Sequence, residues 1–154
     1  MVIFLTDTRE QMPLQFGPTL RKEFSDGGSR IATLQEGDYS IAFEDGEPLS
    51  IRLERKSLGD LYGVIGFGRD RFERELERLR SYQYAAIIIE ATLDEVLRGF
   101  SRSSISPRAA IGSLCAWSTR YGVAVWFAEN HRRAAGIAQR LLEAFAVDEL
   151  RKSG

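Results

Sequence analysis

Two short, continuous apolar runs place the strongest limit on how this chain can fold. Val2–Thr6 leads directly into Asp7, and Ala85–Ile89 leads directly into Glu90. Strands that are apolar on both faces are typical of parallel sheets whose two sides are covered by helices. Such sheets place their ligands at the carboxyl ends of the strands. We therefore expect Asp7 to lie at a site, and Glu90 is a further candidate supported only by its position after a strand.

The rest of the chain alternates between strand and helix patterns. Further strands are predicted at Ile31–Leu34, Tyr39–Phe43, Ile51–Lys56 and Val123–Phe127. Helices are predicted at Pro18–Phe24, after Ser57, at Arg69–Tyr82, Thr92–Gly99 and Ser106–Tyr121, and after Asn130. Strands interleaved with helices predict an α/β protein with a three-layer α/β/α fold around a central mixed sheet. The length of 154 residues, of which 44% are apolar, predicts a single domain over residues 1–154.

The composition excludes several kinds of site. Cys115 is the only cysteine and His131 the only histidine, so an intrachain disulfide and the usual Cys/His zinc sites are excluded. Cys115 is expected in a buried helix with a structural role, and His131 at the surface or in a helix cap. Acid–base or metal chemistry must therefore come from Asp, Glu and Lys.

Charge and hydropathy indicate the environment of the protein. The net charge of −1 arises from 21 basic and 22 acidic residues, so any surface for nucleic acid must be local. No apolar run approaches the roughly 20 residues of a membrane span, and the apolar N-terminus is too short for a signal peptide. These features predict a soluble intracellular protein, cytoplasmic or, in a eukaryote, nuclear, with no membrane contact.

The predicted strand Ile51–Lys56 carries the residues with the clearest chemistry. Side chains alternate between the faces of a strand, so Glu54 and Lys56 share one face with Arg52, and the apolar side chains take the other. An acid and a lysine two residues apart can bind a divalent cation and a water molecule side by side. A solvated edge strand is the simpler interpretation of the same residues taken alone.

A polar turn precedes this strand and predicts a hairpin. The turn is Glu44–Pro48, which contains Gly and Pro. The hairpin would bring Asp38 from the preceding strand near Glu54. Because carboxylates are the ligands that hard cations such as Mg²⁺ and Mn²⁺ prefer, the two strands together predict a two-carboxylate metal site.

Four short motifs resemble the XPF-type nuclease domain in their order and approximate spacing. They are Asp7–Glu10, Gly37–Tyr39, Glu54–Ser57 followed by Asp60, and Gly68–Phe72. The family signature is GD, a gap, and then ERKxxxD. The resemblance covers most of the chain and is strongest between Gly37 and Leu79. It implies a restriction-endonuclease-like fold and divalent-metal-dependent endonuclease activity on branched or flapped DNA, in repair, recombination or replication.

The resemblance also assigns roles by position. It implies an acidic and a basic set, namely Asp7, Asp38, Glu54 and Asp60 with Arg9, Arg55 and Lys56. Asp38 and Glu54 would bind Mg²⁺ or Mn²⁺, and Lys56 would orient or help activate the attacking water. Asp7 would complete the acidic cluster, either as a ligand of a second metal ion or as a support for the ligands.

Three of these residues have alternative roles. Arg9 and Arg55 would order the carboxylates or touch phosphate. Strand alternation points Arg55 away from Glu54, so a structural ion pair is the alternative for Arg55. Asp60 follows Ser57, which can cap a helix, so Asp60 can serve as a first-turn acid instead of a metal ligand.

An arginine-rich, acid-free stretch is the main candidate for DNA contact. Val96–Ala128 contains no Asp or Glu, and phosphate contacts commonly come from Arg and Ser. The Gly-rich break before Arg69 offers further arginines. The predicted DNA-binding residues are Arg69, Arg71, Arg98, Arg102 and Arg108. For each of them, a solvated surface charge is the alternative.

The C-terminal helix is a candidate interface. The apolar side of Asn130–Phe145 either closes the core or also pairs with another subunit, and members of the family commonly dimerise through this region. We therefore expect a homodimer or a heterodimer. Relatives usually add a tandem helix-hairpin-helix module, which is not found before Gly154. This leaves recognition of flaps or junctions to a partner or to another part of a longer protein, and a lone domain would suit a bacterium or phage.

Two other functions are compatible with the sequence. One is a catalytically silent DNA-binding or scaffold subunit, which would not need the whole set of Asp7, Asp38, Glu54, Lys56 and Asp60. The other is a small metal-dependent hydrolase with a different substrate, for which an arginine-rich surface has no purpose. A nucleotide hydrolase of the P-loop type is not indicated, since GxxxxGK is absent.

Overall fold

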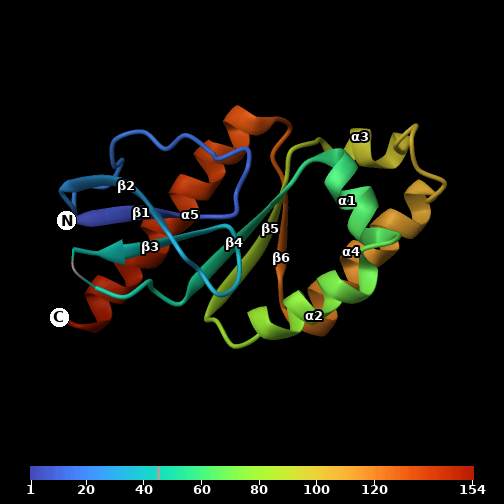
Figure 1. The fold of residues 1–154 in the computed structure, drawn as a ribbon. Helices are drawn as coiled ribbons and strands as arrows, with labels where there is room; N and C mark the ends of the chain where they lie inside the picture. Colours follow the sequence, from blue (N-terminus) through green and yellow to red (C-terminus); the bar gives the residue numbers. More distant parts are fainter. Residues whose placement is uncertain (45) are drawn as a thin grey trace.

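A mixed sheet forms the centre of the molecule in the computed structural model, which describes residues 1–44 and 46–154 (Figure 1). Its strands are β1 (Val2–Asp7), β2 (Asp26–Ala32), β3 (Tyr39–Phe43), β4 (Ile51–Lys56), β5 (Tyr84–Ile89) and β6 (Ala124–Phe127). Their order across the sheet is β2-β1-β3-β4-β5-β6. Within the described residues, β3 alone is antiparallel to its neighbours.

Helices cover both faces of this sheet. They are α1 (Leu58–Ile65), α2 (Arg69–Leu79), α3 (Leu93–Arg98), α4 (Pro107–Tyr121) and α5 (His131–Lys152). Helix α5 crosses behind the sheet in Figure 1 and packs against β3, β4 and β5, whereas α1, α2 and α4 gather on the opposite face. The predicted three-layer α/β/α fold, of the restriction-endonuclease-like kind, is therefore confirmed. None of the helices in the two described ranges is long and apolar enough to span a bilayer.

The two faces of β4 belong to separate parts of the core. Leu53 packs with the apolar side of α5, whereas Ile87 of β5 packs with α1, α2 and α4. Glu54 is paired with Ile87 in the register of the two strands and therefore points to the same face. Glu54 and Lys56 thus face the helices α1 and α2, and Arg55 faces α5.

The parallel strands end at one edge of the sheet. Asp7 is the last residue of β1, Lys56 is the last residue of β4, and Glu90 follows β5. The antiparallel strand β3 begins at the same edge, directly after Asp38. Carboxylates from widely separated parts of the chain therefore meet at this edge, as the position of Asp7 after an apolar strand predicted.

Capping side chains fix three of the predicted helix starts. The side chain of Ser57 accepts a hydrogen bond from the N–H of Asp60, and Thr92 forms a reciprocal capping box with Glu95. The side chain of Asn130 caps α5 in the same way. These starts depend on residues within one turn, so the sequence alone located them.

Residues 18–24 do not form the predicted helix. The buried carboxylate of Glu143 on α5 accepts a hydrogen bond from the backbone N–H of Leu20. The side-chain amide of Gln139 donates to the carbonyl of Pro18. Because these backbone groups bond to side chains of another element, the segment follows an irregular path over α5 instead of closing helical turns.

The bounds of one strand differ from the prediction, and one predicted turn is only partly described. Strand β2 runs over Asp26–Ala32, so it begins and ends earlier than the predicted Ile31–Leu34. The antiparallel pairing of β3 with β4 confirms the hairpin. Of its predicted turn, Glu44–Pro48, residue Asp45 lies outside the described residues.

Helix α4 turns Cys115 outward, contrary to the buried position predicted for it. The buried side of this helix contains Leu114 and Trp117. An apolar sequence indicated that the helix packs against the core, but the packing of its neighbours decided which side does so.

Candidate active site

The turn before β3 holds Asp38 beside β4. The N–H of Asp38 donates to the carbonyl of Leu53 at 2.8 Å, and the N–H of Arg55 donates to Asp38 Oδ2 at 2.8 Å. The two partners, Leu53 and Arg55, flank Glu54 in the sequence. The bonds therefore hold Asp38 next to Glu54. Gly37 has a φ of +81°, and a Cβ there would lie 3.0 Å from Cβ of Arg52, so glycine is required for the turn.

Asp38 and Glu54 form an acidic pair in which Glu54 is buried and Asp38 is half-buried. Glu54 is only 3% exposed. Burial raises the pKa of Glu54 well above its usual range, and the nearby carboxylates of Asp38 and Glu75 raise it further. Burial also raises the pKa of Asp38 to about 6. The Lys56 Nζ lies 3.6 Å from Glu54 Oε2, so one ammonium faces several carboxylates. The repulsion between these neighbouring carboxylates is what a bound cation would relieve.

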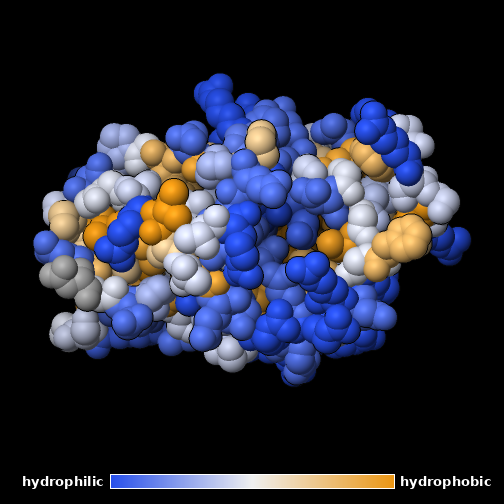
Figure 2. Space-filling view, in the orientation of Figure 1, coloured by the Kyte–Doolittle hydropathy of each residue, from blue (hydrophilic) through white to orange (hydrophobic). Residues whose placement is uncertain are grey.

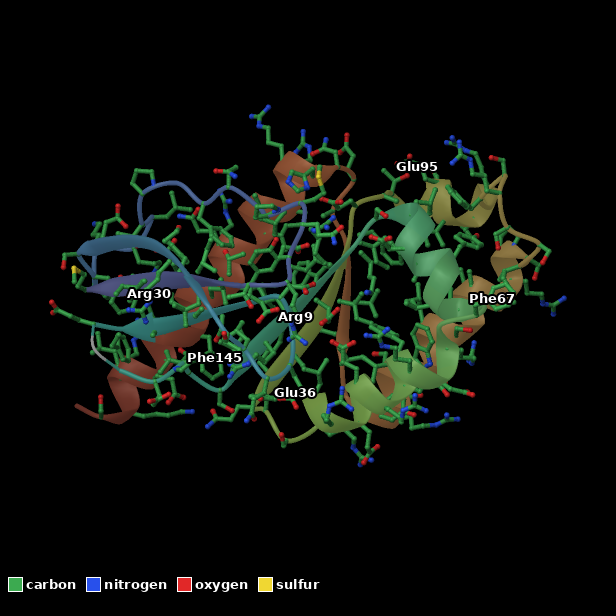
Figure 3. The ribbon with its side chains drawn as sticks, viewed as in Figure 1. Arg9, Arg30, Glu36, Phe67, Glu95 and Phe145 are labelled. Carbon is green, nitrogen blue, oxygen red and sulfur yellow. The ribbon has the colours of Figure 1, made fainter. Side chains whose placement is uncertain are left out.

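The acidic pair opens into a cleft of about 240 Å³. Its lining residues are Asp7, Arg9, Gln35, Gly37, Asp38, Glu54, Lys56, Arg71, Glu75 and Arg78. Figure 3 places Arg9 in the middle of the view, between the strands on the left and α1 and α2 on the right. Figure 2 shows a hydrophilic band down the middle of this face. The predicted residues Asp7, Arg9, Asp38, Glu54 and Lys56 are therefore brought together.

Asp7 is held by donors on both of its carboxylate oxygens. The N–H of Leu34 donates to Oδ1 at 2.8 Å, and the Nε of Arg9 donates to Oδ2 at 2.8 Å. Burial works to raise the pKa of Asp7, but these bonds outweigh it and hold the pKa below its usual value. Arg9 also donates through Nη2 to the carbonyl of Leu34. This arrangement ties the loop before Asp38 to the end of β1 and favours the supporting role for Asp7.

Arg55 lies on the other face of the sheet, outside the cleft. Its guanidinium contacts Glu10 Oε2 at 3.0 Å and Glu90 Oε1 at 2.8 Å. Glu90 also contacts Nδ1 of His131, at the start of α5. The side chains of Arg55, Glu10 and Glu90 are each at most 10% exposed. This geometry agrees with a structural ion pair for Arg55, and it gives Glu90 and His131 a place in the same network.

Asp60 also lies outside the cleft lining. It is exposed in the first turn of α1, and its N–H donates to the side chain of Ser57. An acid in the first turn is favourable for the helix on electrostatic grounds alone.

The predicted DNA-binding arginines occupy different positions. Arg71 lines the cleft, and Arg102 lines a second hollow between α1 and the loop that joins α3 to α4. Arg98 ends α3 and Arg108 lies in the first turn of α4, and both are exposed. Arg69 is engaged within the protein, because its Nη1 donates to Ser113 Oγ at 2.8 Å and its Nε lies 3.4 Å from Glu73.

Sequence reasoning missed Glu75, Arg78 and Gln35 as lining residues of the cleft. Positions 71, 75 and 78 share one side of α2 at helical spacing, next to the buried stripe that contains Phe72. This signal becomes usable only when α2 is known to cover the face of β4 that carries Glu54.

A second missed group braces the loop that carries Asp38. The hydroxyl of Tyr82 donates to Glu36 Oε2 at 2.6 Å, and Nε of Arg78 lies 3.4 Å from Glu36 Oε1. The guanidinium carbon of Arg52 lies 4.4 Å from the centroid of the Tyr82 ring. Arg52 is only 7% exposed and also donates to Ser40. Arg52, which was predicted to share a face of the strand with Glu54 and Lys56, thus supports the cleft from beneath.

The acidic pair fits the ligand requirements of a hard divalent cation. Within the described ranges, no group of three or more Asp, Glu, His or Cys side chains is arranged to hold a metal ion. Mg²⁺ commonly takes only one or two carboxylates from the protein and fills its other positions with water and substrate phosphate. Asp38 and Glu54 offer carboxylate oxygens of that kind, and their mutual repulsion favours a cation between them.

Comparison with known protein families shows which family this chain belongs to. The ERCC4 domain matches residues 6–141, which include Asp7, Asp38, Glu54 and Lys56. The chain belongs to the ERCC4 domain family. The resemblance to the XPF-type nuclease domain inferred from the motifs is therefore confirmed. A comparison with curated proteins found no match.

Solved structures of XPF from Aeropyrum pernix share the fold. XPF from Aeropyrum pernix matches with a TM-score of 0.67 and 21% identity over 92% of this chain and 60% of that chain. XPF from Aeropyrum pernix in complex with DNA matches with a TM-score of 0.67 and 20% identity over 97% of this chain and 66% of that chain. The ERCC4 domain described here thus spans less than two thirds of the length of these relatives.

Proposed function

We propose that this chain is a divalent-metal-dependent endonuclease that cleaves branched or flapped DNA during repair, recombination or replication. The observation that carries the proposal is the acidic pair of half-buried Asp38 and buried Glu54, which faces Lys56 in a cleft rimmed by Arg9 and Arg71. Membership of the ERCC4 domain family supports it. The similar XPF structure in complex with DNA supports DNA as the ligand.

The cleft residues divide the work of phosphodiester hydrolysis. Asp38 and Glu54 would hold Mg²⁺ or Mn²⁺, which when bound supplies Lewis acidity and a more acidic water. Lys56 would orient the attacking water and place positive charge where the phosphate accumulates negative charge. Asp7 would keep the loop before Asp38 in position through its bonds to Leu34 and Arg9.

Arginines outside the acidic pair would bind the DNA backbone. Arg9 and Arg71 stand at the rim of the cleft, where phosphates next to the scissile bond would lie. Arg98, Arg102 and Arg108 extend this positive surface across α3 and α4. Arg69 stays a predicted contact, since its side chain is 38% exposed although it is bonded to Ser113.

The C-terminal helix would provide a subunit interface. Ile137, Leu141 and Phe145 are only partly buried on the side of α5, and Trp126 of the edge strand β6 is 40% exposed. A homodimer or a heterodimer formed through this region would cover these apolar side chains.

Cleavage of end-labelled DNA tests the proposal. Duplex, 3′-flap, fork and single-stranded DNA would be incubated with the wild type and Mg²⁺, Mn²⁺ or EDTA. We expect metal-dependent cleavage of branched DNA, which Glu54→Gln and Lys56→Ala reduce by about a thousandfold or more. Glu77→Gln is the matched control, because Glu77 is an exposed acid on α2 that pairs with Arg80 outside the cleft.

The other outcomes are equally informative. A folded wild type that binds DNA and cuts none of these substrates with either metal would favour the silent scaffold subunit and direct the search to a partner. Cleavage that persists in Glu54→Gln would place the active site elsewhere. Equal activity in EDTA would contradict the role of a divalent cation.

A further inference from the structure

The turn between α1 and α2 presents a fully exposed aromatic ring. Phe67 has 109% relative exposure and projects from the helical end of the molecule in Figure 3. Its flanking residues are hydrogen-bonded, since Gly66 N–H donates to the carbonyl of Tyr62 at 3.1 Å and Gly68 N–H donates to that of Gly63 at 3.0 Å. The ring is therefore held out on an ordered turn.

Phe67 borders a hollow of about 480 Å³ that combines aromatic and phosphate-binding groups. The rings of Tyr62 and Phe100 stack in its wall with centroids 6.1 Å apart. Arg102 and Ser103 line the same hollow, and no ion pair of Arg102 occurs within the described part of the chain. The hollow is large enough to admit a nucleobase with its sugar.

The surface leads from this turn to the acidic cleft. A hollow of about 300 Å³ is lined both by Val64 and Gly68, which lie next to this turn, and by Lys56 and Arg71. Lys56 and Arg71 also line the cleft that holds Glu54. A chain bound at Phe67 can therefore continue to the catalytic carboxylates along one connected surface.

We propose that Phe67 and the hollow of Arg102 bind an unpaired nucleotide of the DNA substrate, a few nucleotides from the scissile bond. This rests on the proposed nuclease function and specifies its substrate as DNA with unpaired nucleotides. The base stacks on the Phe67 ring, and Arg102 with Ser103 contacts the adjoining phosphate. Aromatic rings next to arginines are the usual means by which proteins hold single-stranded nucleic acid without reading its sequence.

The local charge favours DNA over a protein partner as the occupant. The stretch 96–128, which supplies Arg102, contains arginines and no Asp or Glu. A phosphate backbone complements this surface, and base pairs inside a duplex cannot stack on a protein ring because both of their faces are covered by neighbouring bases. The site therefore selects unpaired nucleotides.

Equilibrium binding in EDTA tests the site without cleavage. Fluorescence anisotropy would compare a duplex carrying a single-stranded flap with a blunt duplex of the same paired sequence. We expect Phe67→Ala to weaken flap binding about tenfold and to leave blunt-duplex binding unchanged. Phe67→Trp should retain flap binding, whereas Phe67→Leu, which is apolar without a π face, should not. Ile31→Ala on β2 is the matched control, since Ile31 is 71% exposed at the opposite edge of the sheet.

A fluorescent base provides a direct signature. 2-Aminopurine at the first unpaired positions of the flap should be quenched by the wild type and not by Phe67→Ala. If Phe67→Ala binds and quenches as the wild type does, or loses affinity equally for both DNAs, the inference is overturned while the nuclease proposal stands. If the wild type neither binds nor cuts DNA, both are overturned.

Discussion

Strand β4 presents charged residues to both faces of the sheet, and the two faces treat them differently. On the α5 face, Arg55 contacts Glu10 at 3.0 Å and Glu90 at 2.8 Å, so each carboxylate has a cation at close range. On the α2 face, Glu54 lies beside Asp38 with Lys56 as the nearest cation. A matched buried cluster holds the fold together, whereas an unmatched one stores repulsion that a ligand can relieve.

Removing one charge from each face of β4 tests whether the two faces contribute differently to stability. Arg55→Met leaves two buried carboxylates without their cation, so we expect it to lower the free energy of unfolding by about 3 to 5 kcal/mol. Glu54→Gln relieves repulsion and should leave that free energy unchanged or raise it. Urea denaturation in EDTA measures both, with Arg80→Met as the control for an exposed pair. Equal destabilisation by the two variants would show that the faces do not differ.

The pH dependence of stability gives a second test, which concerns the acidic pair of Asp38 and Glu54. The pKa of Asp38 is raised from 3.8 to about 6 in the folded protein, and that of Glu54 is raised as well. The folded state therefore binds these protons more tightly than the unfolded state, and stability is lost as the pH rises from about 4 through about 6 and beyond. For Asp38 alone the loss is about 2 kcal/mol.

Comparison with a variant isolates this effect from the other carboxylates. In EDTA, the advantage in unfolding free energy of Glu54→Gln over the wild type should grow from about pH 4 to about pH 7. Added Mg²⁺ should raise the melting temperature of the wild type more at neutral than at acidic pH. An advantage that shrinks as the pH rises would contradict the assigned pKa direction.

The brace beneath Asp38 should affect metal use more than folding. Tyr82→Phe removes the hydroxyl that donates to Glu36 but keeps the ring under Arg52. We expect the Mg²⁺ concentration for half-maximal cleavage to rise several-fold, with a stability loss of about 1 kcal/mol. Tyr84→Phe is the matched control, because the Tyr84 hydroxyl accepts from Trp126 at the far edge of the sheet. A similar rise in both variants would rule out a specific brace.

The smallest expected effect concerns Glu75. Its carboxylate is one of the charges that raise the pKa of Glu54, after burial and Asp38. Glu75→Gln should shift the acidic limb of the pH–rate profile to lower pH by a few tenths of a unit. Glu77→Gln, two positions further along α2 and outside the cleft, should leave the profile in place. A shift to higher pH would show that Glu75 does not act on Glu54 as a negative charge.

Local rules determined much of the fold before any tertiary contact was known. The apolar runs at Val2–Thr6 and Ala85–Ile89 gave two buried parallel strands, and the alternation along β4 separated Glu54 from Arg55. Capping residues such as Ser57 and Asn130 marked helix starts. These features follow from the geometry of one strand or one helical turn, so neighbouring residues are sufficient to predict them.

Only the tertiary structure decided which distant side chains meet. Glu143 on α5 bonds to the segment 18–24, which the sequence pattern had predicted to be a helix. Because Glu143 lies more than a hundred positions away in the sequence, no local pattern could predict this contact. Glu75 joins the cleft because α2 packs over β4, and Tyr82 supports Asp38 because the chain after α2 returns to the loop before β3. The sequence by itself determined which carboxylates would stand at the strand ends. Packing decided whether each of them is matched by an opposite charge, because burial and distance set the energy of every pair.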